Sequence, residues 1–214
     1  LTEREERQAA HLGTRPEGTV TFRDVAIYDA GQRSRLEHQT VVVEGDRIAW
    51  VGSATDRAAP APSGVVIEGN GRTLLPGLFD MHTHLSENTD GLLAIASGVT
   101  SARDLGNQIE ALSTRIAAWD SGALIGPRVY RHALIDGRGP LAGPTELLVG
   151  NREEALAAVA RAADAGFPAV KLYSSLAPEF AKVIIDEAHK RGMRVAGHVP
   201  AGMTMQQAIE AGYD

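Results

Sequence analysis

The feature that most constrains the fold is an alternation of short apolar runs with helix-like segments after Pro76-Gly77. The strand-like runs fall at 78–82, 99–103, 127–131, 169–173 and 193–198. Parallel strands need a long crossover connection, usually a helix, so this alternation predicts a parallel sheet. Five such βα units are followed by the start of a sixth strand, whereas a closed parallel barrel needs about eight strands. We therefore expect an α/β fold that is either an open parallel sheet or, if the sequence is a fragment, a partial (β/α)₈ TIM barrel.

Two of the helix-like segments carry clear end signals. In NREEALAAVARAADAG, Asn151 is placed to cap the N-terminus, Glu154 fits a capping box, and Gly166 follows the last turn. PEFAKVIIDEAHKRG has Pro178 in its first turn and Gly192 just after its end. These signals indicate helices with defined ends, and they support the βα alternation.

The part before the barrel has a different pattern. TVTFRDVAIYD and TVVVEGDRIAWVG are rich in Val, Ile and aromatic residues, and Gly45-Asp46 separates two strand-like runs that predict a hairpin. We expect three parts: a tail or helix over 1–18, a small β-sandwich part over 19–75, and the barrel units over 76–214.

Composition excludes several classes of protein. The 214 residues carry a formal net charge of -6 with no basic run, which argues against a nucleic-acid-binding protein. No stretch of about 18 apolar residues is present, so we expect no membrane span. The sequence has no cysteine, which rules out disulfides and thiolate metal ligands. The cytoplasm is the default location, although a removed signal peptide stays open because the sequence starts at Leu1.

The run LLPGLFDMHTHL places two histidines one residue apart at a strand end. Residues i and i+2 of a strand share a face, so His82 and His84 should lie side by side with Asp80 in line behind them. Lys171 lies in the fourth strand and His198 ends the fifth. In a parallel barrel, functional side chains come from the C-terminal strand ends, so we expect these groups at one rim. Imidazoles on a shared face are suited to binding a divalent metal.

These motifs carry a family resemblance that extends from about Thr19 to Asp214. LLPGLFDMHTHL resembles the first-strand signature of the amidohydrolase superfamily, and FPAVKLY followed by AGHVP resembles its fourth and fifth strand ends. VVVEGDRIAWVG and GRTLLPG resemble the β-sandwich that precedes the barrel in many members, and the pattern is similar to the branch of imidazolonepropionase-like and Xaa-Pro dipeptidase-like hydrolases.

The resemblance implies a site for one or two divalent metal ions, usually zinc. His82 and His84 would bind the more buried ion, Lys171 as its carbamate would bridge two ions, and His198 would bind the second. The family pattern also has a His ending the sixth strand and an Asp ending the eighth. Both positions would lie beyond Asp214, so we expect a C-terminally truncated chain whose site is incomplete on its own.

The implied function is a metal-dependent hydrolase of a C–N bond in an amide, cyclic amide or dipeptide, or of an ester, through metal-activated hydroxide. Its partner would be a small molecule or dipeptide, with no nucleic acid and no membrane, and we expect a homo-oligomer when the protein is complete. Tyr173, two residues after Lys171, should share its face, and we expect these two residues to be catalytic.

Alternatives remain open at this point. Lys171 could instead reach solvent or form a Schiff base in a metal-free lysine-dependent lyase, and the chain could be a non-catalytic scaffold relative. His198 could be a core histidine, and Tyr173 could serve packing. His132, after the third strand, is a weaker candidate for the site. The segment DGRGPLAGP is expected to be an active-site loop, and Arg103 and Asp104 to be structural or to support the ligands.

Overall fold

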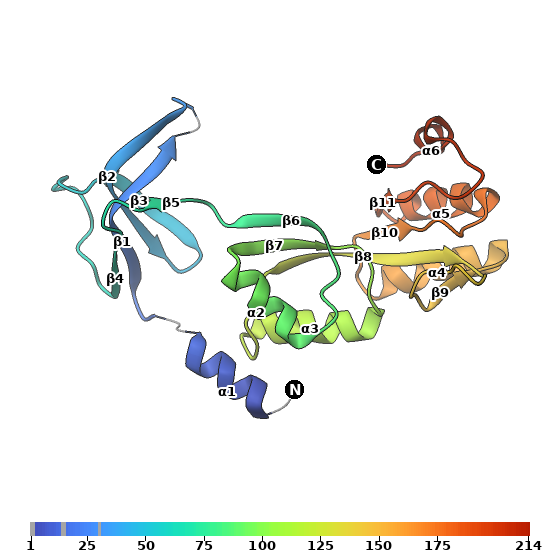
Figure 1. Cartoon of the computed structure of the whole chain (residues 1–214), viewed down its shortest axis with the longest axis horizontal. Coiled ribbons are helices and arrows are strands. Elements are labelled where there is room, and N and C mark those ends of the chain that lie inside the picture. Colours follow the sequence, from blue (N-terminus) through green and yellow to red (C-terminus); the bar gives the residue numbers. More distant parts are fainter. Residues whose placement is uncertain (1–2, 14–15, 30) are drawn as a thin grey trace. The chain divides into compact units, whose positions relative to one another are not determined.

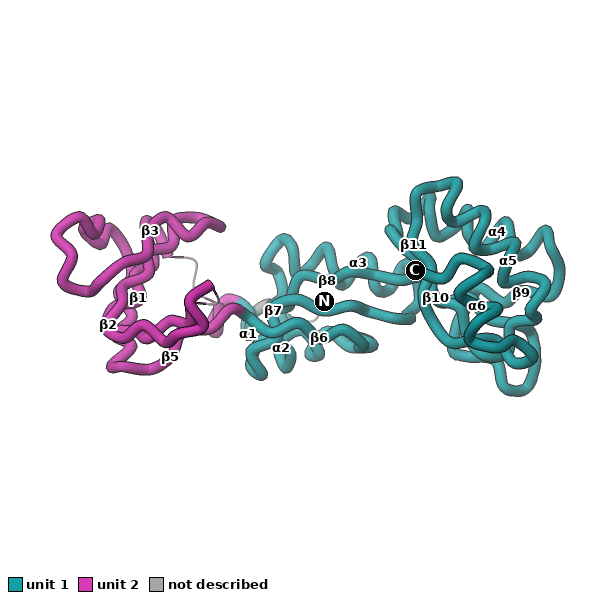
Figure 2. Tube along the Cα trace, turned by 90° about the horizontal axis from the view of Figure 1, so that it is seen from above, with its two compact units in different colours: residues 1–9, 77–214 teal, residues 10–76 magenta. Residues whose placement is uncertain are grey.

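The computed structural model describes residues 3–13, 16–29 and 31–214. It divides into two compact units (Figure 2), one formed by residues up to Ala9 together with Gly77–Asp214, the other by Ala10–Pro76. None of the described helices is long and apolar enough to cross a membrane.

The smaller unit is built on one mixed sheet with the strand order β3-β2-β1-β4, with β5 also paired to β1. Its strands are β1 (Thr19–Asp29), β2 (Ser34–Glu44), β3 (Arg47–Ser53), β4 (Val65–Glu68) and β5 (Thr73–Leu74). The predicted hairpin is confirmed, because β2 and β3 pair antiparallel from Glu44↔Arg47 onward. A separate β unit therefore precedes the barrel strands, as expected.

The larger unit contains the parallel sheet (Figure 1), in the order β11-β10-β8-β7-β6. Its strands are β6 (Leu78–Thr83), β7 (Val99–Asp104), β8 (Arg128–Gly137), β9 (Leu147–Val149), β10 (Ala169–Leu172) and β11 (Arg194–Gly197). Its helices are α2 (Asn88–Ala96), α3 (Ile109–Ser121), α4 (Arg152–Asp164), α5 (Pro178–Lys190) and α6 (Met205–Ala211), together with α1 (Glu3–Leu12) as far as Ala9.

All neighbouring strands of this sheet are parallel, including β10 and β11. The predicted part of a (β/α)₈ barrel is thus confirmed as a curled sheet of parallel strands with helices along it. The third strand, β8, is longer than the predicted 127–131, and this length lets it pair with three other strands. Its first half pairs with β7, and its second half pairs with β10 on one side and with β9 on the other.

The main core lies between the sheet and helices α4 and α5. Val159 of α4 and Ile184 and Ile185 of α5 are fully buried against Val170 of β10 and Val195 of β11. These are the apolar positions of amphipathic helices and of β10, which is buried along its whole length, together with the buried Val195 of β11. This packing holds the ends of β10 and β11 in place, and it therefore positions Lys171 and His198.

The helix-end signals of α4 are largely confirmed. The Asn151 side chain accepts a hydrogen bond from the Glu154 backbone N–H, as an N-cap residue should. The Glu154 carboxylate, however, accepts from the backbone N–H of Gly150 at 2.7 Å and pairs with Arg138. It therefore stabilises the residue before the cap and departs from the reciprocal capping box that the spacing predicts.

Candidate active site

Three strands end at the same edge of the parallel sheet with side chains suited to catalysis. His84 directly follows β6, Lys171 lies near the end of β10 with Tyr173 just beyond it, and His198 directly follows β11. In parallel sheets this carboxyl edge is where ligands bind. The sheet topology therefore gathers these residues from positions more than a hundred residues apart.

A cavity of about 330 Å³ opens at this edge. Its walls come from the ends of β6, β8 and β10 and from the loops that follow β7 and β8, through His84, Ser86, Gly106, Asn107, Gln108, Leu134, Pro144, Lys171 and Tyr173. The cavity therefore joins three of the five predicted site residues directly. Its size suits a small molecule.

The two remaining predicted residues reach this group through ring contacts. The His82 and His84 rings lie edge to face with their centroids 5.6 Å apart. The His198 ring lies against Tyr173 at 4.4 Å, and Tyr173 in turn lies under the Lys171 ammonium, with Nζ 5.2 Å from the ring centroid. All five side chains thus form one connected cluster at the strand ends.

His84 and His198 each have one ring nitrogen engaged. His84 Nδ1 lies 2.8 Å from the carbonyl oxygen of Gly106, and His198 Nδ1 lies 2.9 Å from Ser174 Oγ. The backbone of Gly197 has φ +138°, and a Cβ there would lie 2.2 Å from the carbonyl oxygen of Leu172. Glycine is therefore required at this position for the turn that presents His198.

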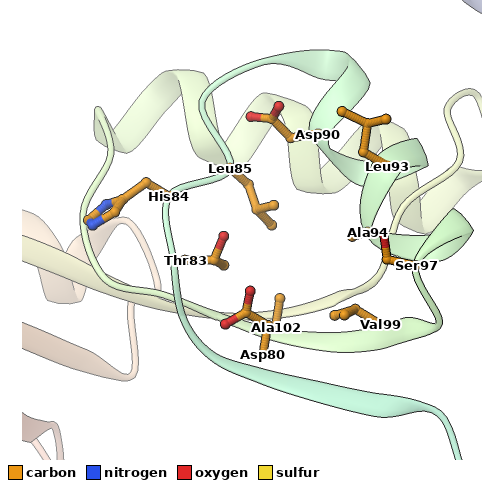
Figure 3. Close-up of a pocket in the computed structure, with 10 residues that line it drawn as sticks. All are labelled: Asp80, Thr83, His84, Leu85, Asp90, Leu93, Ala94, Ser97, Val99 and Ala102. Carbon is orange, nitrogen blue, oxygen red and sulfur yellow. The ribbon is translucent and has the colours of Figure 1, made fainter.

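Asp80 departs from the expectation that it lies in line with the two histidines. The pairing of β6 with β7 is irregular between Asp80 and Thr83, which breaks the alternation of faces. Asp80 and Thr83 face a second cavity, between β6 and α2, while the His84 ring leaves the chain on the other side (Figure 3). The Asp80 carboxylate accepts the backbone N–H of His82 at 3.0 Å, so it supports the strand end.

Lys171 is the most unusual residue of the cluster. Its side chain is 2% exposed, and within the described part of the chain no hydrogen bond or ion pair engages Nζ. Burial lowers its pKa, and Arg103 acts in the same direction, while the Asp104 carboxylate opposes the shift. The pKa of His82 is also lowered, first by desolvation and then by the charge of Lys171. Desolvation therefore disfavours the charged form of both side chains.

The donor chemistry fits a divalent metal in part. Within the described residues, no three His, Cys, Asp or Glu side chains come together closely enough to hold an ion. The Nδ1 contact of His84 leaves its Nε2 as the nitrogen available to a metal, and His82 lies beside it. Lys171 adds an oxygen ligand only if its amine is carbamylated. The chain thus supplies a histidine pair and two further donors at one strand edge.

His132 lies elsewhere than predicted. It sits within β8, because that strand runs on to Gly137, and it lines a largely apolar cavity with Phe79, Met81 and Tyr130. Its side chain is buried, and Nδ1 makes no hydrogen bond with the described residues. Burial lowers the pKa of His132 from 6.5 to about 4.

This burial predicts a pH-dependent stability. Between about pH 6.5 and pH 4 the unfolded state binds a proton on His132 that the folded state resists, so stability falls as the pH falls through this window. We expect His132→Gln to flatten this part of the curve of unfolding free energy against pH, measured by urea denaturation. An unchanged slope would show that His132 takes up its proton equally in both states.

Two buried carboxylates lie near strand ends beside the site: Asp104, which was expected to be structural or to support the ligands, and Asp136. Asp104 ends β7 and Asp136 lies near the end of β8, and both are fully buried. Asp136 accepts the backbone N–H groups of Gly137 at 2.8 Å and of Gly143 at 2.7 Å, which fixes the loop 138–146. This loop brings Pro144 to the cavity, consistent with its expected place over the site. In the sequence, such a loop anchor is indicated by an Asp at a strand end that is followed closely by glycines.

Comparison with known proteins supports the fold. No family model matches the chain. A 70-residue segment is 49% identical to an N-substituted formamide deformylase of Arthrobacter pascens, covering 30% of this chain and 13% of that protein. A 50-residue segment is 52% identical to an imidazolonepropionase of Arthrobacter sp. strain FB24, covering 23% of this chain and 12% of that protein.

Among solved structures, a candidate prolidase from Bifidobacterium longum matches with a TM-score of 0.77 and 27% identity, over 92% of this chain and 53% of that one. A Xaa-Pro dipeptidase with bound methionine matches with a TM-score of 0.71 at 21% identity, over 92% of this chain and 60% of that one, which shows the fold. The chain thus spans little more than half the length of these structures. In its fold and in these segments the chain is similar to members of the amidohydrolase superfamily. Within that superfamily it is similar to imidazolonepropionases and to structures named for prolidase activity.

Proposed function

We propose that the complete protein is a metal-dependent hydrolase that cleaves a C–N bond in a small amide, cyclic amide or dipeptide. The observation that carries this proposal is the meeting of His84, Lys171 and Tyr173 in one cavity at the carboxyl edge of the sheet. The deformylase, imidazolonepropionase and prolidase names of the relatives support the reaction class. Hydrolysis of an ester by the same residues is the most closely related reaction.

In this proposal His82 and His84 hold a divalent ion, with zinc expected, and the Lys171 carbamate and His198 extend the site toward a second ion. When bound, the metal supplies Lewis-acid activation of water and of the scissile carbonyl. The chain's own contribution is to place the imidazoles of His82 and His84 at the strand edge and to present a buried lysine that has no hydrogen-bond partner among the described residues.

The burial of Lys171 prepares it for carbamylation. The neutral amine nitrogen forms a bond to the carbon of CO₂ and releases one proton, which leaves an anionic carbamate with two oxygen atoms. A neutral amine is needed, and an exposed lysine has a pKa of about 10.4. The lowered pKa of Lys171 increases the reactive fraction, because desolvation disfavours the ammonium form.

Tyr173 is proposed to contact the substrate. Its ring forms part of the cavity wall between Lys171 and His198, and Leu134 and Pro144 supply apolar surface beside it. We expect Tyr173→Phe to raise KM roughly fivefold with a smaller change in kcat, because a lost neutral hydrogen bond costs about 1 kcal/mol. Steady-state kinetics measure both constants, and Tyr130→Phe in the other cavity is the matched control. Equal KM values in the two variants would exclude a polar contact from Tyr173.

A metal-free lysine-dependent lyase is the second candidate, because the same burial of Lys171 favours Schiff-base formation with a carbonyl substrate. Borohydride reduction in the presence of carbonyl substrates separates the two functions. A covalent adduct on Lys171, found by peptide mass spectrometry, would support the lyase. The hydrolase predicts none.

The proposed function is tested by assaying the complete protein with zinc against N-formyl amines, cyclic amides, Xaa-Pro dipeptides and simple esters. Hydrolysis of a C–N substrate that ceases in Lys171→Ala is the expected result. Failure to hydrolyse any member of the panel by a protein with stoichiometric metal would contradict the proposed bond class.

A further inference from the structure

Asp104 makes three hydrogen bonds at the edge of the candidate site while being fully buried. Its carboxylate accepts the backbone N–H of Leu85 at 2.8 Å, the backbone N–H of Gly106 at 3.0 Å and the Asn107 side-chain amide at 2.8 Å. A buried carboxylate is costly unless it is satisfied in this way. The residue therefore ties together the loop after β6 and the loop after β7.

The two backbone N–H groups that donate to Asp104 belong to Leu85 and Gly106, and both residues lie next to His84. Leu85 directly follows His84, and the carbonyl oxygen of Gly106 lies 2.8 Å from His84 Nδ1. A carbonyl oxygen can only accept, so this contact requires the proton to be on Nδ1. The neutral ring then carries its lone pair on Nε2.

The position of the Gly106 carbonyl depends on a constrained backbone. Gly106 has φ +145°, a region that is strained for other residues, and an added Cβ would lie 3.1 Å from Leu134 Cβ and Cδ2. The backbone N–H of Gly106 donates to the Asp104 carboxylate at 3.0 Å, which ties this turn to the end of β7. The carbonyl is thus placed jointly by the glycine and the carboxylate.

We propose that Asp104 is a positioning residue that sets the tautomer of His84. By holding Gly106 and Leu85, it keeps the Gly106 carbonyl on His84 Nδ1 and leaves Nε2 bare. The use of that bare nitrogen as a metal ligand rests on the proposed function, whereas the tautomer does not. Partners of this kind typically change metal affinity by about 10–100-fold when removed.

Asp136 provides a matched control for a purely structural role. It is equally buried near the end of the neighbouring strand, and it also accepts two backbone N–H groups of the loop that follows. Those groups belong to Gly137 and Gly143 and make no contact with His84. Asp136→Asn should therefore lower stability much as Asp104→Asn does, without acting on the His84 ring.

The test uses the complete protein, labelled with ¹⁵N-histidine and freed of metal, with the His84 signals assigned from a His84→Gln sample. Long-range ¹H–¹⁵N correlation spectra report which ring nitrogen carries the proton. We expect a protonated Nδ1 in the wild type and in Asp136→Asn, and a mixture of tautomers in Asp104→Asn. Gly106→Ala, which moves the same carbonyl without touching the carboxylate, should give the same mixture.

Zinc affinity, measured by competition with a chromogenic chelator, is the second readout. We expect about 10–100-fold weaker binding in Asp104→Asn and Gly106→Ala than in Asp136→Asn. A proton on Nε2 of His84 in the wild-type protein would overturn the proposal, and this result does not depend on whether the variants fold. Finding the wild-type tautomer in both Asp104→Asn and Gly106→Ala would also overturn it. A tautomer change without any zinc binding would uphold the positioning role and count against the proposed function instead.

Discussion

Replacing Lys171 with alanine is expected to lower kcat/KM of the complete protein at least about a hundredfold. Even supporting residues around a metal typically contribute 10–100-fold, and the proposal assigns Lys171 a direct ligand role. Lys171 is buried, and its ammonium lies 5.2 Å from the centroid of the Tyr173 ring. Metal analysis by mass spectrometry should show loss of most of the second ion.

A small carboxylic acid provides a chemical check on this variant. Alanine leaves space where the lysine side chain was, and acetate or propionate can supply the two oxygen atoms that the carbamate would present. Partial recovery of activity with added acid is therefore expected. Lys182→Ala, at an exposed lysine that pairs with Asp186, is the control and should keep full activity. Normal metal content and activity in Lys171→Ala would show that the lysine is not a ligand.

Replacing His82 with alanine should have the second large effect. It removes one imidazole of the pair whose rings lie 5.6 Å apart, so the ion would keep one histidine from this strand end. We expect a loss of bound metal and a fall in kcat/KM of at least about a hundredfold, measured by metal analysis and kinetics on the same samples.

His38→Ala is the control for this variant. His38 lies in the smaller unit, where its ring contacts Asp24 at 2.7 Å, and it plays no part in the cluster. Its substitution should leave metal content unchanged. If His82→Ala bound as much metal as His38→Ala, the metal site would not be the pair of His82 and His84.

Much of the fold was predictable because local signals agree with the tertiary structure. The βα alternation after Pro76-Gly77 identified the parallel strands, and the Gly45-Asp46 turn identified the hairpin of the β unit. The N-cap Asn151 was visible for the same reason, since a cap is set by residues within one helical turn. The gathering of His84 and Lys171 followed from topology alone, because parallel strands end at one edge.

The details that were missed depend on contacts between distant segments. The irregular pairing of β6 with β7 turns Asp80 away, and no feature of LLPGLFDMHTHL reveals it. The length of β8 is set by its pairing with β9 and β10, which places His132 inside the strand. For Asp104 the sequence predicted a structural or ligand-supporting role, but not its partners: its carboxylate accepts the backbone N–H of Leu85, which lies 19 residues earlier in the loop after β6.

The most direct test of the central claim is removal and return of metal in the complete protein while C–N bond hydrolysis is followed. The proposed function predicts that dialysis against a chelator abolishes activity, and that zinc restores it in proportion to the metal bound by His82 and His84. The His82→Ala protein should not recover under the same conditions. Full activity in a protein shown to be metal-free would contradict the account.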